Sequence, residues 1–172
     1  QLGKRILVTS TIPGEGKSFA SLNLAQVLGM SNKKVLVIGA DLRSPKLLTY
    51  LGITGVHQGL SNVLSDASVD YHNLIIPADK NRQFDLLHSG DIPPNPSELL
   101  MNARFKEVMT VMQQQYDFII VDAPPVSLVG DALTLSAQTD LTLYMVRVKH
   151  MDKRMLTVLE EMYSHKKLKN IA

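Results

Sequence analysis

The sequence contains no cysteine and no tryptophan, and aromatic residues make up only 5% of its 172 residues. Without cysteine there is no disulfide framework and no thiolate chemistry, which is compatible with a reducing compartment. The scarcity of aromatic side chains argues against a surface that stacks single-stranded bases. No apolar run approaches the roughly 20 residues that span a bilayer, and no secretory signal is visible at Gln1.

Positive charge is also sparse. The formal net charge is +2, and the cluster at 165–169 (HKKLK) is typical of a solvated helix end rather than a nucleic-acid site. We therefore expect no nucleic acid among the partners. With 45% hydrophobic and 20% charged residues, residues 1–172 are predicted to form one globular domain. We expect that domain to be truncated at both ends, because a strand begins almost at once and another starts at 169–172.

The most informative stretch is residues 8–18, which read VTSTIPGEGKS. An apolar run at 6–8 precedes it and predicts a buried strand, and residues 19–28 have helical periodicity. A strand, a tight loop ending in Gly-Lys-Ser and a helix form the layout of a phosphate-binding loop. A glycine-rich turn with a surface lysine is the alternative, and the flanking strand and helix argue against it.

The residue types explain the chemistry of such a loop. Gly14 and Gly16 allow backbone N–H groups to approach an anion closely, next to a helix N-terminus. Lys17 can reach the terminal phosphates, and the Ser18 hydroxyl can bind Mg²⁺. The general motif has glycine six residues before the lysine, where this chain has Thr11, so the turn is expected at Pro13–Gly14.

Strands and helices alternate along the rest of the chain. Strands are predicted at 34–38, 118–122 and 141–146, with weaker candidates at 74–77 and 84–88. Helices are predicted at 47–51, 97–115 and 130–137, together with a last helix capped by Asp152. This alternation predicts an α/β fold, a P-loop three-layer sandwich whose central sheet is mostly parallel and has helices on both faces.

Polar residues follow several of these strands. Asp41 and Arg43 follow the second strand, and Asp122 ends an apolar run. Ligands bind beyond the carboxyl ends of parallel strands, so we expect these residues to join the phosphate-binding loop, with Asp122 holding Mg²⁺. Asp131 is interpreted only as a helix N-cap, and the five histidines show no metal-ligand spacing.

Several segments together resemble the cytosolic domain of bacterial tyrosine kinases. Residues 10–18 are similar to the family's Walker A motif, and residues 41–45 (DLRSP) to the end of its Walker A′ motif. Residues 118–125 resemble its Walker B motif with an Asp-x-Pro-Pro continuation. Residues 59–64 and 89–100 are similar to further family segments. The resemblance therefore covers nearly the whole chain in the right order.

The resemblance implies an ATP-dependent protein-tyrosine autokinase, with ATP or ADP and Mg²⁺ as cofactors, that regulates exopolysaccharide or capsule synthesis and export. It implies a cytoplasmic domain at the inner face of the bacterial plasma membrane. The transmembrane chain-length or adaptor region would lie in the same polypeptide or in a separate one. The implied partner is the tyrosine-rich C-terminal tail of a neighbouring subunit in a ring of identical subunits.

Carried onto this sequence, the resemblance implies roles for individual residues. Catalysis would involve Lys17, Asp41 and Asp122. The metal ligands would be Ser18, Asp41 and Asp122. The nucleotide would be bound by Pro13, Gly14, Glu15, Gly16, Lys17, Ser18, Phe19, Arg43 and Arg147. For Arg147, a structural ion pair is the alternative.

The sequence departs from the family pattern in three ways. Gly39 stands where the Asp-x-Asp of Walker A′ has its first aspartate, the five tyrosines are scattered, and the arginine-bearing helix before the first strand is missing. Gly39 motivates one alternative, a nucleotide-binding regulatory module with little or no kinase activity. A ParA- or MinD-like ATPase is a second alternative. Such ATPases usually have a second lysine early in the loop, where this chain has Ile12.

Overall fold

The structure, a computed structural model, describes residues 2–78, 83–127 and 130–172. Within these ranges the strands form one sheet in the order β3-β4-β2-β5-β1-β6. The strands are β1 (Lys4–Ser10), β2 (Val35–Gly39), β3 (Ile76–Pro77), β4 (Asp85–Leu87), β5 (Phe118–Asp122) and β6 (Leu141–Met145). All pairings are parallel except that of β3 with β4.

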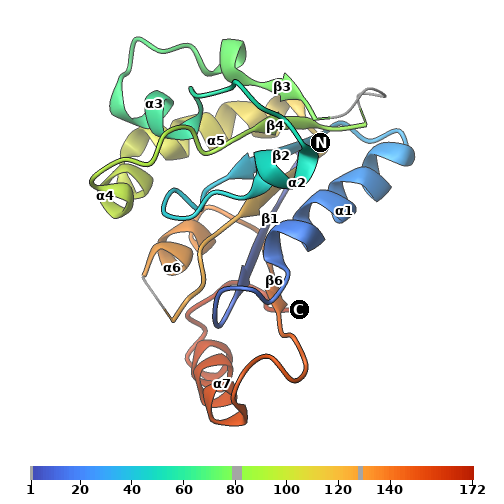
Figure 1. The fold of residues 1–172 in the computed structure, drawn as a ribbon, viewed down its shortest axis with the longest axis vertical. Helices are drawn as coiled ribbons and strands as arrows, with labels where there is room; N and C mark the ends of the chain where they lie inside the picture. The colour runs from blue at the N-terminus through green and yellow to red at the C-terminus, as the bar shows by residue number, and fades with distance from the viewer. Residues whose placement is uncertain (1, 79–82, 128–129) are drawn as a thin grey trace.

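The described helices lie between successive strands along the chain, except the last one, which follows β6 and lies at the bottom of the view in Figure 1. They are α1 (Lys17–Met30), α2 (Leu47–Leu51), α3 (Leu60–Ser65), α4 (Pro96–Met101), α5 (Ala103–Gln115), α6 (Asp131–Ser136) and α7 (Leu156–Ser164), with 3₁₀ turns at Tyr71–Leu74 and Lys153–Met155. None of the described helices is long and apolar enough to cross a membrane.

Two apolar layers cover the sheet because side chains alternate between the two faces of each strand. On one face, Ile6 and Val8 of β1 and Ile120 of β5 pack with residues of α1 and α2. On the other, Leu7 and Ile119 pack with α3, α4, α5 and α6. The predicted three-layer α/β sandwich with helices on both faces is therefore confirmed.

Three details of the predicted elements were wrong. The helix predicted over 97–115 is broken at Asn102, which has an extended backbone and accepts a hydrogen bond from the Arg104 N–H as the cap of α5. The strand predicted over 74–77 is reduced to Ile76–Pro77, and it follows a 3₁₀ turn. Asp152 caps the 3₁₀ turn before α7 rather than α7 itself.

The carboxyl ends of the central parallel strands meet at one edge of the sheet. Gly39 at the end of β2 and Val8 of β1 are both in register with Asp122 at the end of β5. The loops that follow β1, β2 and β5 therefore start side by side, as ligand binding at this edge requires.

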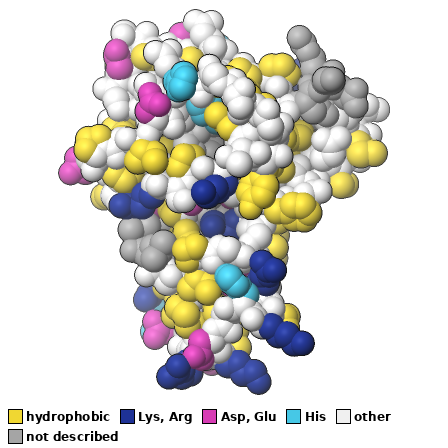
Figure 2. Space-filling view, in the orientation of Figure 1, with side chains coloured by type: hydrophobic (Ala, Val, Ile, Leu, Met, Phe, Trp, Pro, Cys, Tyr) yellow, Lys and Arg dark blue, Asp and Glu magenta, His cyan; other side chains and the backbone are white. Residues whose placement is uncertain are grey.

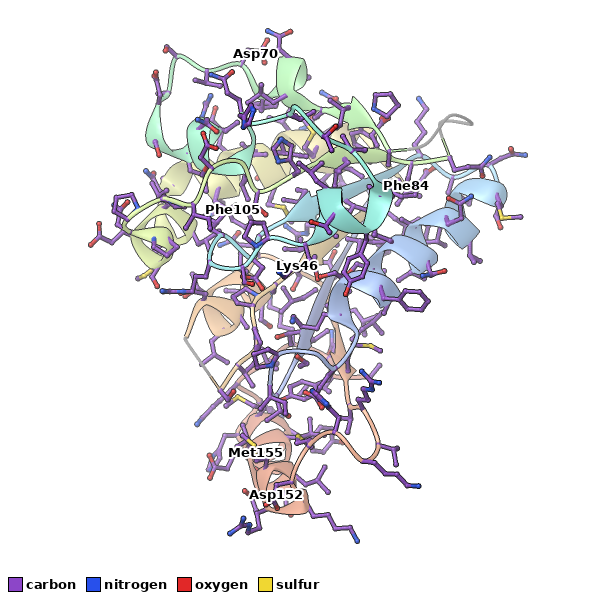
Figure 3. The ribbon with its side chains drawn as sticks, viewed as in Figure 1. Lys46, Asp70, Phe84, Phe105, Asp152 and Met155 are labelled. Atoms are coloured by element: carbon purple, nitrogen blue, oxygen red, sulfur yellow. The ribbon has the colours of Figure 1, made fainter. Side chains whose placement is uncertain are left out.

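The different burial of Phe105 and Met101 predicts that replacing them changes the free energy of unfolding by very different amounts. Phe105 of α5 is 1% exposed, whereas Met101 of α4 is 70% exposed, and Phe105 is labelled in Figure 3. We expect Phe105→Ala to lower the free energy of unfolding by about 3–5 kcal/mol, because it leaves a cavity. Met101→Ala should change it by less than about 0.5 kcal/mol. Urea denaturation of both variants measures this, and equal losses would contradict the packing described here.

Candidate functional site

The loop between β1 and α1 has the backbone that a phosphate-binding loop requires. Gly14 and Gly16 have φ values of 85° and 94°, in the left-handed region that glycine adopts without steric cost. Gly16 is the N-cap of α1, and Lys17 is the first residue of the helix. The predicted turn at Pro13–Gly14 is thus present, and the N-terminus of a 14-residue helix faces the loop.

Side chains outside the loop hold it in place. The hydroxyl of Thr11, the residue that replaces the usual glycine, is fully buried and lies 3.0 Å from the Tyr144 hydroxyl of β6. His150 Nε2 lies 3.0 Å from the Pro13 carbonyl oxygen. Arg147 Nη1 donates to the Gly14 carbonyl at 3.3 Å. The segment after β6 therefore supports the loop from one side.

Glu15 was predicted to bind the nucleotide, and its side chain does not face the pocket. It is 3% exposed, and its carboxylate accepts hydrogen bonds from the backbone N–H groups of Ile12 at 2.9 Å and Arg147 at 3.2 Å. The carboxylate thus ties the loop to the segment after β6. A carboxylate inside a tight loop satisfies buried N–H groups, and nucleotide binding by Glu15 stays a prediction.

Asp122 lies beneath the loop and joins the two halves of the site. The Ser18 hydroxyl donates to Asp122 Oδ2 at 2.6 Å, and the Ser21 hydroxyl to Oδ1 at 3.4 Å. The backbone carbonyl of Asp122 accepts from the N–H groups of Ala40 and Asp41 at 2.9 and 3.0 Å. One residue therefore fixes both the start of α1 and the segment after β2.

Burial dominates the titration of Asp122, which is 2% exposed. Desolvation raises the pKa of this carboxyl from 3.8 to about 6, and the nearby charge of Asp41 adds to the rise. The hydrogen bond from Ser18 and the charge of Lys17 act in the opposite direction. The protein's own groups therefore compensate only part of the negative charge of this carboxylate.

A cavity of about 540 Å³ opens in front of the loop. Most of the predicted site residues line it, namely Pro13, Gly14, Gly16, Lys17, Ser18, Phe19, Asp41, Arg43 and Arg147. Figure 2 shows Lys and Arg side chains near the centre of this face, and Lys46, labelled in Figure 3, is among the lining residues. The cavity is thus lined by four basic side chains, and their positive charge suits a polyphosphate. They are Lys17, Arg43, Lys46 and Arg147.

Sequence reasoning missed several residues of this region. Tyr50 of α2 and Lys46, directly before α2, line the cavity. Pro124 and Pro125, which follow β5, line it as well. Asp131, interpreted as an N-cap, is instead the first residue of α6 and forms an ion pair with Arg43. The double proline after Asp122 was the available signal for the residues after β5.

The donors present fit Mg²⁺, a hard cation that prefers oxygen ligands and retains waters. Ser18 and Asp122 offer adjacent oxygens, and the raised pKa of Asp122 marks a buried carboxylate that a divalent cation would stabilise. Among the described residues no group of three or more His, Cys, Asp or Glu side chains could hold a metal. A Mg²⁺ ion here would therefore depend on phosphate oxygens as further ligands.

Comparisons with known proteins agree with this geometry. A family model described as an AAA domain matches residues 3–148. The tyrosine-protein kinase YwqD of Bacillus subtilis is 39% identical over 137 residues, which cover 80% of this chain and 56% of YwqD. The tyrosine-protein kinase etk of Escherichia coli K12 is 37% identical over 142 residues, covering 83% of this chain and 19% of etk. The chain thus spans little more than half of one relative and a fifth of the other.

Two solved structures extend the comparison. The BceF tyrosine kinase domain has a TM-score of 0.82 and 31% identity, over 98% of this chain and 67% of its own. The septum site-determining protein MinD of Pyrococcus horikoshii, complexed with Mg-ADP, has a TM-score of 0.79 at 22% identity, over 99% and 68%. The likeness to MinD concerns the fold alone.

The titration of Asp122 yields a pH-dependent prediction. Because the folded-state pKa of about 6 lies above the reference value of 3.8, the wild-type chain without ligand loses stability as pH rises between these values. Asp122→Asn mimics the protonated form. At pH 7.5 we expect it to be more stable than wild type by on the order of 3 kcal/mol, and at about pH 3, below both pKa values, the two should be nearly equal. Urea denaturation at both pH values measures the difference, and a pH-independent difference would contradict the assignment.

Proposed function

This chain belongs to the AAA domain family, in its bacterial tyrosine kinase branch, and on that premise we propose that it binds Mg-ATP and transfers the γ-phosphoryl group to tyrosine side chains. The hydrogen bond between Ser18 and Asp122 beneath the loop carries the proposal. It joins the Walker A serine to the Walker B aspartate next to a cavity lined by Lys17 and Asp41. This cavity is lined by residues that follow β1, β2 and β5.

Phosphoryl transfer asks mainly for positioning and for stabilisation of charge. The N–H groups at the start of α1 and the Lys17 ammonium would bind the phosphate oxygens. Ser18 and Asp122 would hold Mg²⁺, which supplies charge neutralisation on the phosphates when bound. Arg147, which lines the cavity beside Gly14, would bind the nucleotide on the side of β6.

Asp41 is the candidate for handling the tyrosine proton. It is partly exposed in the cavity, and its Oδ1 accepts a hydrogen bond from the Ser44 N–H at 3.0 Å. That bond fixes the carboxylate and leaves Oδ2 for the acceptor hydroxyl or for the metal. A carboxylate within hydrogen-bond reach of the attacking hydroxyl can take its proton. Asp41 and Asp122 would thereby share the catalytic role with Lys17.

The tyrosines of this chain are poor candidates for a tail that reaches a neighbouring site. Tyr71 and Tyr144 are buried, and the Tyr116 hydroxyl donates to Asp85 Oδ2 at 2.8 Å. Tyr50 and Tyr163 are exposed, but each lies within a helix, α2 and α7 respectively, rather than in an extended tail. We therefore propose that the acceptor is a tyrosine-rich C-terminal tail of a neighbouring subunit in a ring. In that assembly the domain works at the inner face of the plasma membrane, together with a transmembrane chain-length or adaptor region, in exopolysaccharide or capsule synthesis.

The direct test supplies a tyrosine-rich tail peptide with Mg-ATP and detects phosphotyrosine by mass spectrometry. Wild type should phosphorylate the peptide, and Asp122→Asn should reduce the rate at least about 10²-fold, because it removes the metal carboxylate. Lys17→Met should weaken ATP binding at least about tenfold, since it removes a buried charge from the phosphates. An unchanged ATP affinity in Lys17→Met, or ATP binding by wild type without transfer, would contradict the proposed kinase.

The second candidate, a regulatory module without transfer, rests on Gly39. A Cβ at this position would lie 2.7 Å from Ser89 Oγ, 3.0 Å from Ser89 N and 3.1 Å from Leu47 Cδ1. A side chain at position 39 would therefore meet the segment after β4 and the start of α2. A group that acts only in the transition state affects the rate without affecting ATP binding, so its loss is compatible with a nucleotide-binding module.

A matched pair of variants separates the effect of adding a carboxylate at position 39 from the steric cost of adding a Cβ there. Gly39→Ala adds the crowded Cβ alone, and Gly39→Asp adds the Cβ with the carboxylate. If the chain is a regulatory module because of Gly39, Gly39→Asp should transfer phosphate to tyrosine about 10²-fold faster than Gly39→Ala. Equal rates for the two variants in the peptide assay, with both still binding ATP, would remove the argument from Gly39.

A further inference from the structure

Arg43 takes part in a closed set of three hydrogen bonds that links three separate elements. Its Nε donates to Asp131 Oδ2 at 3.2 Å and its Nη2 to Ser97 Oγ at 2.7 Å. The Ser97 hydroxyl in turn donates to Asp131 Oδ1 at 2.6 Å. Arg43 follows β2, Ser97 lies in the first turn of α4, and Asp131 begins α6. We call these three residues the Arg43 network.

The burial of Asp131 indicates that this carboxylate anchors the Arg43 side chain in one orientation. Asp131 is 4% exposed, and a buried carboxylate is costly unless it is paired and hydrogen-bonded. Both of its oxygens are engaged, one by Arg43 and one by Ser97. The side chain of Arg43 is 39% exposed, so the anchor is inside the protein and the guanidinium is at the cavity wall.

The guanidinium retains donors for a ligand. Nε and one Nη2 hydrogen are used, and within the described residues Nη1 makes no hydrogen bond. Arg43 lines the cavity together with Lys17, Ser18 and Asp41. An arginine held on one edge by a carboxylate presents a fixed fork of N–H groups on the other, and this geometry suits phosphate oxygens.

We propose that Arg43 contacts the phosphoryl group in transfer, and that Asp131 and Ser97 are positioning residues that aim its guanidinium. The inference rests on the proposed function for the reaction it serves. Arg43 lies two residues beyond Asp41 and lines the same cavity as Lys17. It therefore adds positive charge where charge spreads over the transferring group, a role that arginine fulfils in other P-loop enzymes.

A second ion pair of the same chain provides a matched control. Arg5 Nη2 donates to Asp140 Oδ1 at 2.8 Å and Arg5 Nε to Asp140 Oδ2 at 3.3 Å. Arg5 lies near the start of β1, at the edge of the sheet opposite the cavity. Asp140→Asn therefore breaks a comparable arginine–carboxylate pair without touching the site.

The experiment measures Mg²⁺-dependent affinity for ADP and for ADP with tetrafluoroaluminate, a mimic of the phosphoryl group in transfer, alongside tyrosine transfer to the tail peptide. Arg43→Lys, Asp131→Asn and Ser97→Ala should each weaken the tetrafluoroaluminate complex at least about tenfold, the loss of one charge-assisted hydrogen bond. ADP affinity should change less than about threefold. Ser97→Thr keeps the hydroxyl and should behave as wild type, and Asp140→Asn should do the same.

The outcomes separate this inference from the proposed function. Selective loss of the tetrafluoroaluminate complex in the network variants supports the inference, even if wild type transfers nothing to tyrosine and the kinase proposal fails. The inference is overturned if Ser97→Ala and Asp131→Asn match Asp140→Asn, or if Ser97→Thr is as impaired as Ser97→Ala. Equal weakening of ADP and of the mimic would also overturn it, because that result marks a purely structural role. Thermal denaturation of every variant verifies that it is folded.

Discussion

The site depends on one buried carboxylate at the end of the central strand. Asp122 binds the Ser18 and Ser21 hydroxyls with its side chain, and the N–H groups of Ala40 and Asp41 with its carbonyl. Because β5 lies between β2 and β1, this residue is adjacent to both loops that a nucleotide must contact. Its desolvation leaves a charge that the protein only partly compensates, and a bound cation would complete the site.

The phosphate-binding loop is held by groups that lie outside its motif. Tyr144 reaches the Thr11 hydroxyl, Glu15 bridges to the segment after β6, and His150 meets the Pro13 carbonyl. Each such contact contributes only about 1 kcal/mol. Together they fix the direction of the N–H groups, so that an anion meets donors that need no rearrangement. Preorganised donors are worth more in a partly buried site than in water.

Much of the architecture could be predicted from the sequence because its signals are local. The loop at 8–18 and the strand ending at Asp122 are short patterns of consecutive residues, which can be recognised without knowing what packs against them. The Arg43 network could not be predicted, since its ion pair joins residues 88 positions apart. The Thr11–Tyr144 contact spans 133 positions. The inward direction of Glu15 depends on the N–H groups of Ile12 and Arg147, which only the folded chain brings together. The crowding at Gly39 depends on Ser89, after β4, and on Leu47 of α2.

Ser18 and Asp122 are proposed to hold the Mg²⁺ ion of the nucleotide-binding site. The most direct measurement is calorimetric titration of the chain with ADP, with and without Mg²⁺. We expect Mg²⁺ to tighten ADP binding at least about tenfold, or 1.4 kcal/mol. Ser18→Ala should remove this gain while metal-free ADP binding stays within about threefold. ADP binding that is equal in Mg²⁺ and in EDTA, or a Mg²⁺ effect that persists in Ser18→Ala, would contradict the account.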